Sequence, residues 1–315
     1  MSTRRRRQGE SEVQAMRTRR SILQSAAAAA AGSFLGARAS ARPKEIVRES
    51  AYNYIIVSQD GPVVSFRRME NGAAISAIDM SRPSYQVIPY TKFLFAPALI
   101  NPNPAAVLSI GLGAGSFNRL FNVIYPDATL TSVEIDPMIR DLALEFTNFQ
   151  ESERNKVVIE DGRRFLRRSR DRWDWIIIDA FVRNSQYPPH LATHEFFTLV
   201  ADHLSDDGLL AINVISGNKL VDCLVGAIMA AFPSVVLFAV PGTANVVVVA
   251  AKSASPPLEE KFKTASAPFS SPMKDNGVDP FAISALGKAP GSLACANPLT
   301  DDFAPTEFLG AQWQK

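Results

Sequence analysis

The feature that most constrains the fold of this chain is an apolar run, residues 105–110, that ends in three alternating glycines. The run is rich in Val, Leu and Ile, which predicts a buried strand. The glycines after it predict a tight turn, and residues 117–121 predict the start of a helix. Gly111, Gly113 and Gly115 lack Cβ atoms, which permits positive φ angles and lets a ligand lie against the backbone. This pattern predicts a nucleotide or nucleoside site, but structural turns also use glycine, so the assignment depends on the strands that follow.

Three further predicted strands each end in an acid. They lie in segments 129–137, 156–162 and 174–181 and deliver Glu134, Asp161 and Asp179 to the carboxyl edge that the glycines also occupy. Open parallel sheets bind their ligands at this edge, and an acid at the end of the second strand typically holds a ribose diol. Glu134 is therefore the candidate ribose ligand. The alternative is a solvated acid that caps the helix opening at Pro137, a role that Asp136 fits better.

The order of predicted elements indicates an α/β, Rossmann-like fold with a mostly parallel seven-stranded sheet. The last strands lie at 208–215, 235–240 and 244–251, and the final pair has no crossover between them, which predicts an antiparallel terminal hairpin. Hairpin signals between residues 52 and 78 predict a small antiparallel β unit before the sheet, and residues 85–99 have helical spacing. We expect a β unit with its linking helix over residues 42–100, a nucleoside-binding domain over 101–252 and a loosely ordered extension over 253–315.

Residues 1–41 have the pattern of an export signal. Basic residues precede an Ala-rich apolar segment and small residues suited to cleavage, and the pair Arg19 and Arg20 resembles the twin-arginine signal. We therefore expect the twin-arginine machinery to carry the folded chain to the periplasm, with an uncleaved membrane anchor as the less favoured alternative. Translation from Met1 or from Met16 would both retain the arginine pair. The net charge of +2 gives no indication of nucleic-acid binding.

The ordered motifs from about residue 49 to residue 307 resemble the spermidine synthase (polyamine aminopropyltransferase) family, in particular its bacterial spermidine synthase-like branch. The matching segments are 110–115, 133–137, 160–166, 175–181, 189–196 and 299–302. The resemblance implies transfer of an aminopropyl group from decarboxylated S-adenosylmethionine to an amine such as putrescine, with no permanently bound cofactor. It also implies that the glycine loop, Glu134, Asp161 and Gly162 hold the nucleoside, and that Asp179 orients and deprotonates the amine.

Two positions depart from the family pattern. Ala114 and Val182 stand where established aminopropyltransferases carry acids. An acid at 114 would repel the carboxylate of ordinary S-adenosylmethionine, so its loss leaves two alternatives: a methyltransferase that uses S-adenosylmethionine, or a non-catalytic nucleoside- or polyamine-binding protein. Asp79, Asp301 and Asp302 are candidates for the missing negative charge, and we include the last two as candidate substrate-binding residues.

The cysteines and histidines give weaker signals. Cys223 lies in an apolar helical pattern and Cys295 in the extension, and a disulfide between them is compatible with an oxidising compartment. His190 and His194 are four residues apart, but without a third ligand we interpret them as residues near a helix start and predict no metal site. A homodimer is compatible with the sequence.

Overall fold

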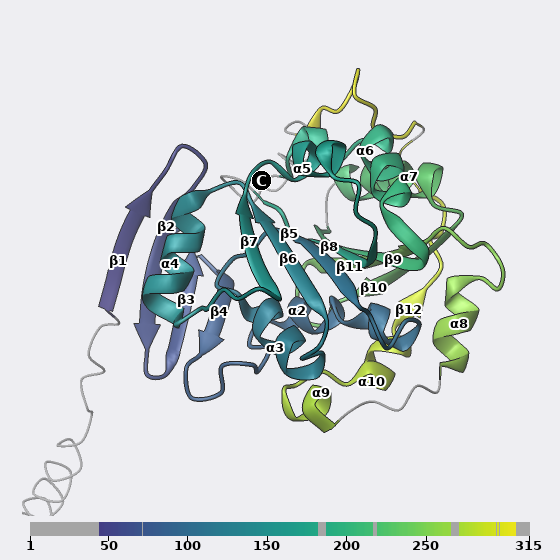
Figure 1. Cartoon of the computed structure of the whole chain (residues 1–315). Helices are drawn as coiled ribbons and strands as arrows, with labels where there is room; N and C mark the ends of the chain where they lie inside the picture. The colour runs from purple at the N-terminus through teal and green to yellow at the C-terminus, as the bar shows by residue number, and fades with distance from the viewer. Residues whose placement is uncertain are drawn as a thin grey trace, which may run out of the picture. The chain divides into compact units, whose positions relative to one another are not determined.

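Two β-sheets form the framework of the computed structural model, which describes residues 44–70, 72–181, 187–216, 219–265, 271–293, 295 and 297–306 (Figure 1). The smaller sheet is antiparallel and consists of β1 (Lys44–Glu49), β2 (Tyr54–Asp60), β3 (Val63–Arg67) and β4 (Ala74–Asp79), in that order. The last three strands coincide with the predicted β unit. Strand β1, which the hairpin signals did not indicate, pairs with β2 along its whole length.

The larger sheet has eight strands in the order β12-β10-β11-β9-β8-β5-β6-β7. Their bounds are β5 (Ala106–Ile110), β6 (Thr129–Glu134), β7 (Asn155–Ile159), β8 (Trp173–Ile178), β9 (Leu204–Ile215), β10 (Ser234–Ala239), β11 (Asn245–Ala251) and β12 (Gly287–Lys288). Strands β5 to β9 are parallel, and β10 and β11 form an antiparallel pair. The α/β fold with its terminal hairpin is thus confirmed. The count of seven strands is corrected to eight, because β12 returns from the extension to pair with β10.

Helices cover both faces of the larger sheet. One face packs against α5 (Gly162–Arg168), α6 (His194–Asp202) and α7 (Lys219–Ala231), and the other packs against the group α2 (Pro89–Phe93), η1 (Ala96–Leu99) and α3 (Ser116–Ile124). Strand β8 alternates between these two cores, with Ile176 and Ile178 on one face and Trp175 and Ile177 on the other. This double burial explains why nearly every residue of β8 is apolar. No helix in the described part of the chain has the length and apolar character needed to cross a membrane.

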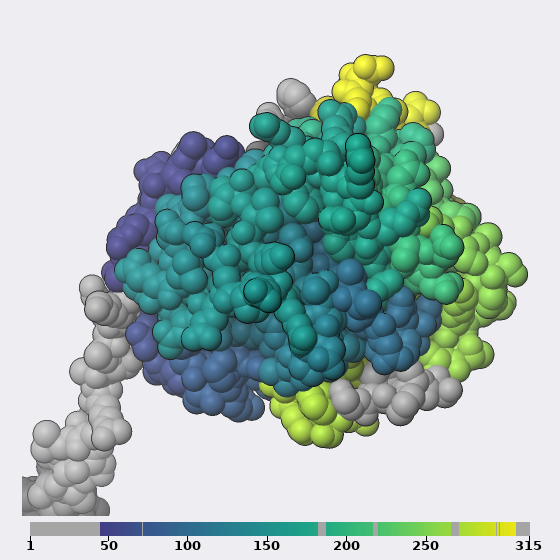
Figure 2. All heavy atoms as spheres, in the orientation of Figure 1, coloured from purple at the N-terminus to yellow at the C-terminus, as the bar shows by residue number. Residues whose placement is uncertain are grey.

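The smaller sheet packs against α4 (Pro137–Thr147). Ile55 and Val57 of β2 lie in one apolar cluster with Leu142 and Ala143 of α4. In the space-filling view the purple atoms of this sheet adjoin the teal atoms of the segment that includes α4 (Figure 2). The β unit is therefore anchored beside the carboxyl edge of the larger sheet, after β6.

The predicted helix over residues 85–99 is wrong in length. The structure has the two short helices α2 and η1 in its place. Pro89 and Pro97 each occupy the start of one of them, where the missing N–H costs nothing. Proline in a helix interior would remove a hydrogen bond and clash with the preceding turn, so a single helix across Pro97 is excluded.

The extension over 253–315 is more regular than its composition predicts. Its described residues form α8 (Leu258–Thr264), α9 (Ser271–Asp275), α10 (Pro280–Ser284) and β12. Phe262, Met273 and Ile283 are buried in the same core as Trp175. Apolar side chains at spaced positions therefore order a segment that is otherwise rich in Pro, Ser, Ala and Lys.

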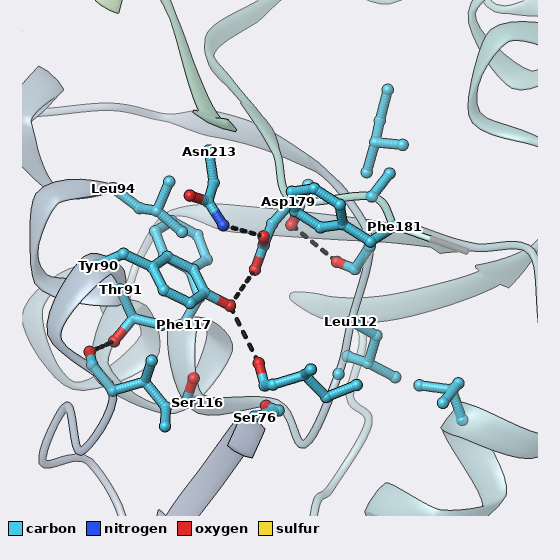
Figure 3. A pocket seen from close by; sticks show the side chains of 18 of the residues that line it. Ser76, Tyr90, Thr91, Leu94, Leu112, Ser116, Phe117, Asp179, Phe181 and Asn213 are labelled. Atoms are coloured by element: carbon cyan, nitrogen blue, oxygen red, sulfur yellow. Dashed lines mark hydrogen bonds between the residues drawn. The ribbon is translucent and has the colours of Figure 1, made fainter. Parts of the chain in front are cut away.

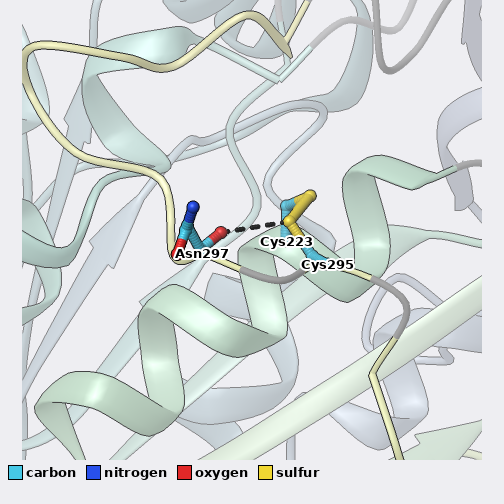
Figure 4. The surroundings of a disulfide bond; sticks show 3 residues. All are labelled: Cys223, Cys295 and Asn297. Atoms are coloured by element: carbon cyan, nitrogen blue, oxygen red, sulfur yellow. Dashed lines mark hydrogen bonds between the residues drawn. A yellow bond between two sulfur atoms is a disulfide. The ribbon is translucent and has the colours of Figure 1, made fainter.

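A disulfide joins this extension to α7. Cys223 and Cys295 are bonded with a Cα–Cα distance of 4.9 Å, which resolves the pairing that the sequence left open (Figure 4). Because the two residues are 72 positions apart, the bond closes a long loop that contains β10, β11 and most of the extension.

Candidate active site

A cavity of about 670 Å³ lies at the carboxyl edge of the parallel strands. The predicted residues Gly111, Glu134, Asp161 and Asp179 all line it, so the structure brings them together. The β unit supplies a second wall, which includes Arg68 at the end of β3. The cavity is thus formed between two sheets, and Figure 3 shows part of its lining.

Glycine is required at the turn after β5. Gly111 has a φ angle of 106°, and a Cβ atom at this position would lie 2.3 Å from the carbonyl oxygen of Asp179. Gly115 has a φ angle of 80°, and a Cβ atom there would lie 2.5 Å from the ring of Phe149. Backbone strain and these contacts both exclude larger residues, so both glycines permit close packing. Gly111 also lines the cavity, whereas Gly115, predicted as a nucleoside ligand, is not among its described lining residues.

The next part of the loop is fixed by the β unit. The N–H of Ala114 donates a hydrogen bond to Oγ of Ser76 at 2.9 Å, and a Cβ atom on Gly113 would lie 2.8 Å from the same oxygen. Ala114 itself is fully buried in the apolar cluster beneath the β unit, whereas Gly113 lines the cavity. Val182, the other departure from the family pattern, lies outside the described residues.

Glu134 faces the glycine loop from the end of β6. Its Oε2 accepts the N–H of Leu112 and its Oε1 accepts the N–H of Asp136, both at 3.0 Å. The residue is only 8% exposed, and burial raises the pKa of its carboxyl to about 7. The alternative role as a solvated cap is therefore wrong for Glu134. Asp136 is the N-cap of α4, because its side chain accepts the N–H of Met138.

Asp161 caps α5 and contacts a histidine. Its Oδ1 accepts the N–H of Arg164 at 2.8 Å, and its Oδ2 lies 2.6 Å from Nε2 of His190. Partial burial acts to raise the pKa of Asp161, but these hydrogen bonds outweigh it and the net pKa is lowered. Gly162 follows in the first turn, where a Cβ atom would lie 2.5 Å from Ile110. Close packing of α5 on β5 therefore requires glycine here.

The two histidines lie in different helical segments. His190 lies in the short helix η3 (Pro189–Leu191) and His194 begins α6, near the helix starts where the sequence placed them. Within the described ranges, no group of three His, Cys, Asp or Glu side chains is arranged to hold a metal ion.

Asp179 is half-buried directly after β8 and is held by two hydrogen bonds. The hydroxyl of Tyr90 donates to Oδ2 at 2.8 Å, and Nδ2 of Asn213 donates to Oδ1 at 2.9 Å (Figure 3). Asn245 in turn donates to Oδ1 of Asn213 at 2.9 Å. Burial raises the pKa of Asp179 despite these donors, so the carboxylate is a stronger base than an exposed aspartate.

The sequence interpretation missed the partners of Asp179. Asn213 had a usable signal, because it is a polar side chain in the middle of the apolar strand β9. Tyr90 and Arg68 had none, since they come from α2 and from the residue after β3. Arg68 donates to the carbonyl oxygen of Phe181 at 2.8 Å, and burial lowers the pKa of its guanidinium.

Asp301 and Asp302 do not contribute to the described lining of the cavity, which corrects their prediction as substrate ligands. Both oxygens of Asp301 accept from the guanidinium of Arg163, each at 2.6 Å, and Oδ1 also accepts from Thr193 at 2.8 Å. A largely buried arginine requires such a partner. Asp302 is exposed. The acidic motif therefore fastens the C-terminal segment to α5 and α6.

Comparison with known proteins identifies related sequences. The spermine/spermidine synthase domain matches residues 90–219. A polyamine aminopropyltransferase of Vibrio vulnificus is 29% identical over 277 residues, which cover 83% of this chain and 90% of the relative. The similarity therefore extends over most of both chains.

Solved structures share the fold. A probable spermidine synthase from Corynebacterium glutamicum superposes with a TM-score of 0.60 and 20% identity, over 81% of this chain and 100% of that one. Human methyltransferase-like protein 13, solved in complex with SAH, superposes with a TM-score of 0.51 and 21% identity, over 66% of this chain and 97% of that one. These likenesses confirm the Rossmann-like, methyltransferase-type architecture.

Proposed function

We infer the reaction of this cavity from one premise: the chain belongs to the spermidine synthase family. We propose that it transfers the aminopropyl group of decarboxylated S-adenosylmethionine to the nitrogen of an amine, a reaction of polyamine biosynthesis. The bound co-substrate would be adenosyl-based and would leave as methylthioadenosine.

The placement of Asp179 is the observation that carries this proposal. An alkylamine is mostly protonated at neutral pH and becomes a nucleophile only after it loses a proton. Burial raises the pKa of Asp179, and the hydrogen bonds from Tyr90 and Asn213 fix the orientation of its carboxylate. Asp179 would accept the proton while the amine nitrogen attacks the carbon next to the sulfonium. The new C–N bond forms as the C–S bond breaks, and the bonding electron pair stays on sulfur.

The opposite side of the cavity suits the nucleoside. Gly111 and Gly113 offer backbone close to the ligand, and the carboxylate of Glu134 presents acceptors for two ribose hydroxyls. Each oxygen of the Glu134 carboxylate has two lone pairs and accepts only one N–H group, from Leu112 or from Asp136. One lone pair on each oxygen therefore remains to accept a ribose hydroxyl. Asp161, held by His190, would accept a hydrogen bond from the adenine amine.

Glu134→Gln should weaken the binding of methylthioadenosine by about 1–3 kcal/mol at pH 8, because a charge-assisted hydrogen bond is lost. Burial raises the pKa of Glu134 to about 7, so the parent carboxyl is ionised above this pH and protonated below it. Affinity in the parent should fall roughly tenfold between pH 8 and pH 6, and this dependence should vanish in the variant. Calorimetric titration at several pH values measures both effects. Equal affinities of parent and folded variant would remove Glu134 from the ribose site.

The proposed reaction is tested by incubating the purified chain with decarboxylated S-adenosylmethionine and a panel of amines. Release of methylthioadenosine with an aminopropylated product supports it. The second candidate, methyl transfer from S-adenosylmethionine, is favoured by one observation, the replacement of an acid by Ala114 at the glycine loop. Methylated product and S-adenosylhomocysteine would identify that reaction, and binding without any product would indicate a binding protein.

We also propose export to the periplasm by the twin-arginine route. The signal within residues 1–41 lies outside the described residues, and the support comes from its motif and from the Cys223–Cys295 disulfide, since such bonds persist in oxidising compartments. A reporter fused to these residues should reach the periplasm. Substitution of both Arg19 and Arg20 by Lys should block its delivery, and unchanged delivery would point to another route.

A further inference from the structure

The charged groups that line the cavity are unevenly distributed. Among the described lining residues, the carboxylates are Glu134, Asp161 and Asp179, and the basic side chains are Arg68 and His190. Glu134 accepts a hydrogen bond from the glycine loop, and Asp161 and His190 are hydrogen-bonded to each other. Among the described residues, the side of the cavity where an acceptor would meet Asp179 therefore has Asp179 and Arg68 as its charged side chains, and the charge of Glu134 also acts on Arg68.

Arg68 is fixed on the same side as Asp179. Its guanidinium donates to the carbonyl oxygen of Phe181, two residues beyond Asp179, at 2.8 Å. Asp179 and Glu134 are close enough for their negative charges to act on the guanidinium of Arg68. The guanidinium and the carboxylate of Asp179 are thus neighbouring, opposite charges at one end of the cavity.

The described residues of the wall beyond Asp179 are neutral. Asn213 of β9, Thr243 of the turn after β10 and Asn245 of β11 line it. Amide and hydroxyl groups form hydrogen bonds with an ammonium group but do not neutralise its charge. A diamine that attacks through one nitrogen keeps a cation at the other, and this cation would meet either neutral groups or the like charge of Arg68.

A molecule with one amine and one carboxylate matches this arrangement. The planar guanidinium of arginine presents paired N–H donors that suit a carboxylate, and charge-assisted bonds of this kind are strong. We propose that Arg68 binds a carboxylate of the acceptor, so that the acceptor is an amino acid whose amine faces Asp179. This inference rests on the proposed aminopropyl transfer and names its acceptor class.

The reaction step is unchanged by this assignment. The acceptor nitrogen loses a proton to Asp179 and forms a C–N bond to the aminopropyl carbon, while the C–S bond breaks and methylthioadenosine leaves. The carboxylate of the acceptor takes no part in bond making. Arg68 is therefore a specificity residue, and its effect should appear in the choice of acceptor.

Ornithine and putrescine form a matched pair for the test, because ornithine is putrescine with a carboxylate on one terminal carbon. With decarboxylated S-adenosylmethionine as the donor, we expect the full chain to prefer ornithine by at least about tenfold in kcat/KM. The pair 4-aminobutyrate and butylamine repeats the comparison with a single amine. A preference for putrescine and butylamine in the parent would overturn the proposal.

Substitution of the arginine separates recognition from a general effect on the site. Arg68→Gln should lower kcat/KM for ornithine about 10- to 100-fold more than kcat/KM for putrescine, chiefly through KM. Arg68→Lys should recover part of the loss. An equal loss with both acceptors, together with a shifted pH profile, would show that Arg68 only balances the charge of Asp179, and would overturn the proposal. Unchanged affinity for methylthioadenosine verifies that the variants are folded.

A second experiment tests whether Arg68 binds the carboxylate of the donor instead of that of the acceptor. If S-adenosylmethionine binds more tightly than its decarboxylated form, and this preference is lost in Arg68→Gln, the carboxylate belongs to the donor and our assignment to the acceptor is wrong. If methylthioadenosine is not released with any acceptor, the proposed aminopropyl transfer is wrong, whatever the role of Arg68. Calorimetry with ornithine and putrescine in the presence of methylthioadenosine then still decides whether Arg68 selects a carboxylate.

Discussion

Asp179→Asn is expected to lower turnover with an amine acceptor by about 10²–10⁴-fold, the usual share of general acid–base catalysis. The substitution removes the proton acceptor and preserves the shape of the side chain. Its hydrogen bonds are preserved as well: the amide oxygen can accept from Asn213, and the amide nitrogen can donate to the hydroxyl of Tyr90, which lies 3.1 Å from the carbonyl oxygen of Ile75 and can donate there instead. Folding and nucleoside affinity should therefore be retained.

The matched control for this variant is Asp174→Asn on the same strand. Asp174 lies at the opposite end of β8, where it accepts from the N–H of Ala105 and the hydroxyl of Ser205, outside the cavity. Turnover should survive this change even if the thermal midpoint falls. Steady-state rates of methylthioadenosine release compare the two variants. An Asp179→Asn protein that turns over like the parent would exclude Asp179 as the base.

Removal of the disulfide is expected to have the largest effect on stability. The Cys223–Cys295 bond closes a loop with a sequence separation of 72, for which the chain-entropy relation gives about 4 kcal/mol. Cys223→Ser with Cys295→Ser, or reduction of the parent, should lower the free energy of unfolding by about 2–4 kcal/mol, because the unfolded chain regains its freedom. Denaturation in guanidinium chloride with and without dithiothreitol measures this change.

The double serine variant also serves as the control for the reductant. Its stability should be the same with and without dithiothreitol, and thiol titration of the unfolded parent should find no free cysteine until reduction. A parent whose stability does not respond to reduction, although its disulfide is shown to be broken, would contradict the expected contribution of the loop.

Local patterns predicted the fold because each element carries its own signal. The apolar run of β8 and the Asp136–Pro137 start of α4 can be recognised without knowledge of their neighbours. The strand β12 has only two residues, Gly287 and Lys288, and exists because β10 offers a free edge at that point. No local sequence pattern in residues 287–288 indicates that β10 is available for pairing.

The same distinction explains the site. Glu134, Asp161 and Asp179 were predicted because each follows a recognisable strand that ends at the ligand edge. Arg68 reaches the cavity from the small sheet and Tyr90 from α2, and the positions of both depend on how these elements pack on the larger sheet. Asp301 was misplaced because an acid in a motif gives no indication that a buried arginine, Arg163, already requires it.

The ion pair between Arg163 and Asp301 has a consequence for the order in which the protein matures. Arg163 also donates to the carbonyl oxygen of His190 at 3.0 Å, and the ring of His190 holds Asp161 on the wall proposed for the adenine. Asp301 follows Arg163 by 138 positions in the sequence, so the ribosome has released Arg163 and the strands around it long before Asp301 is made. The wall proposed for the nucleoside is therefore completed only after the segment that carries Asp301 has been synthesised, and a shorter nascent chain does not yet present a finished site to its ligand.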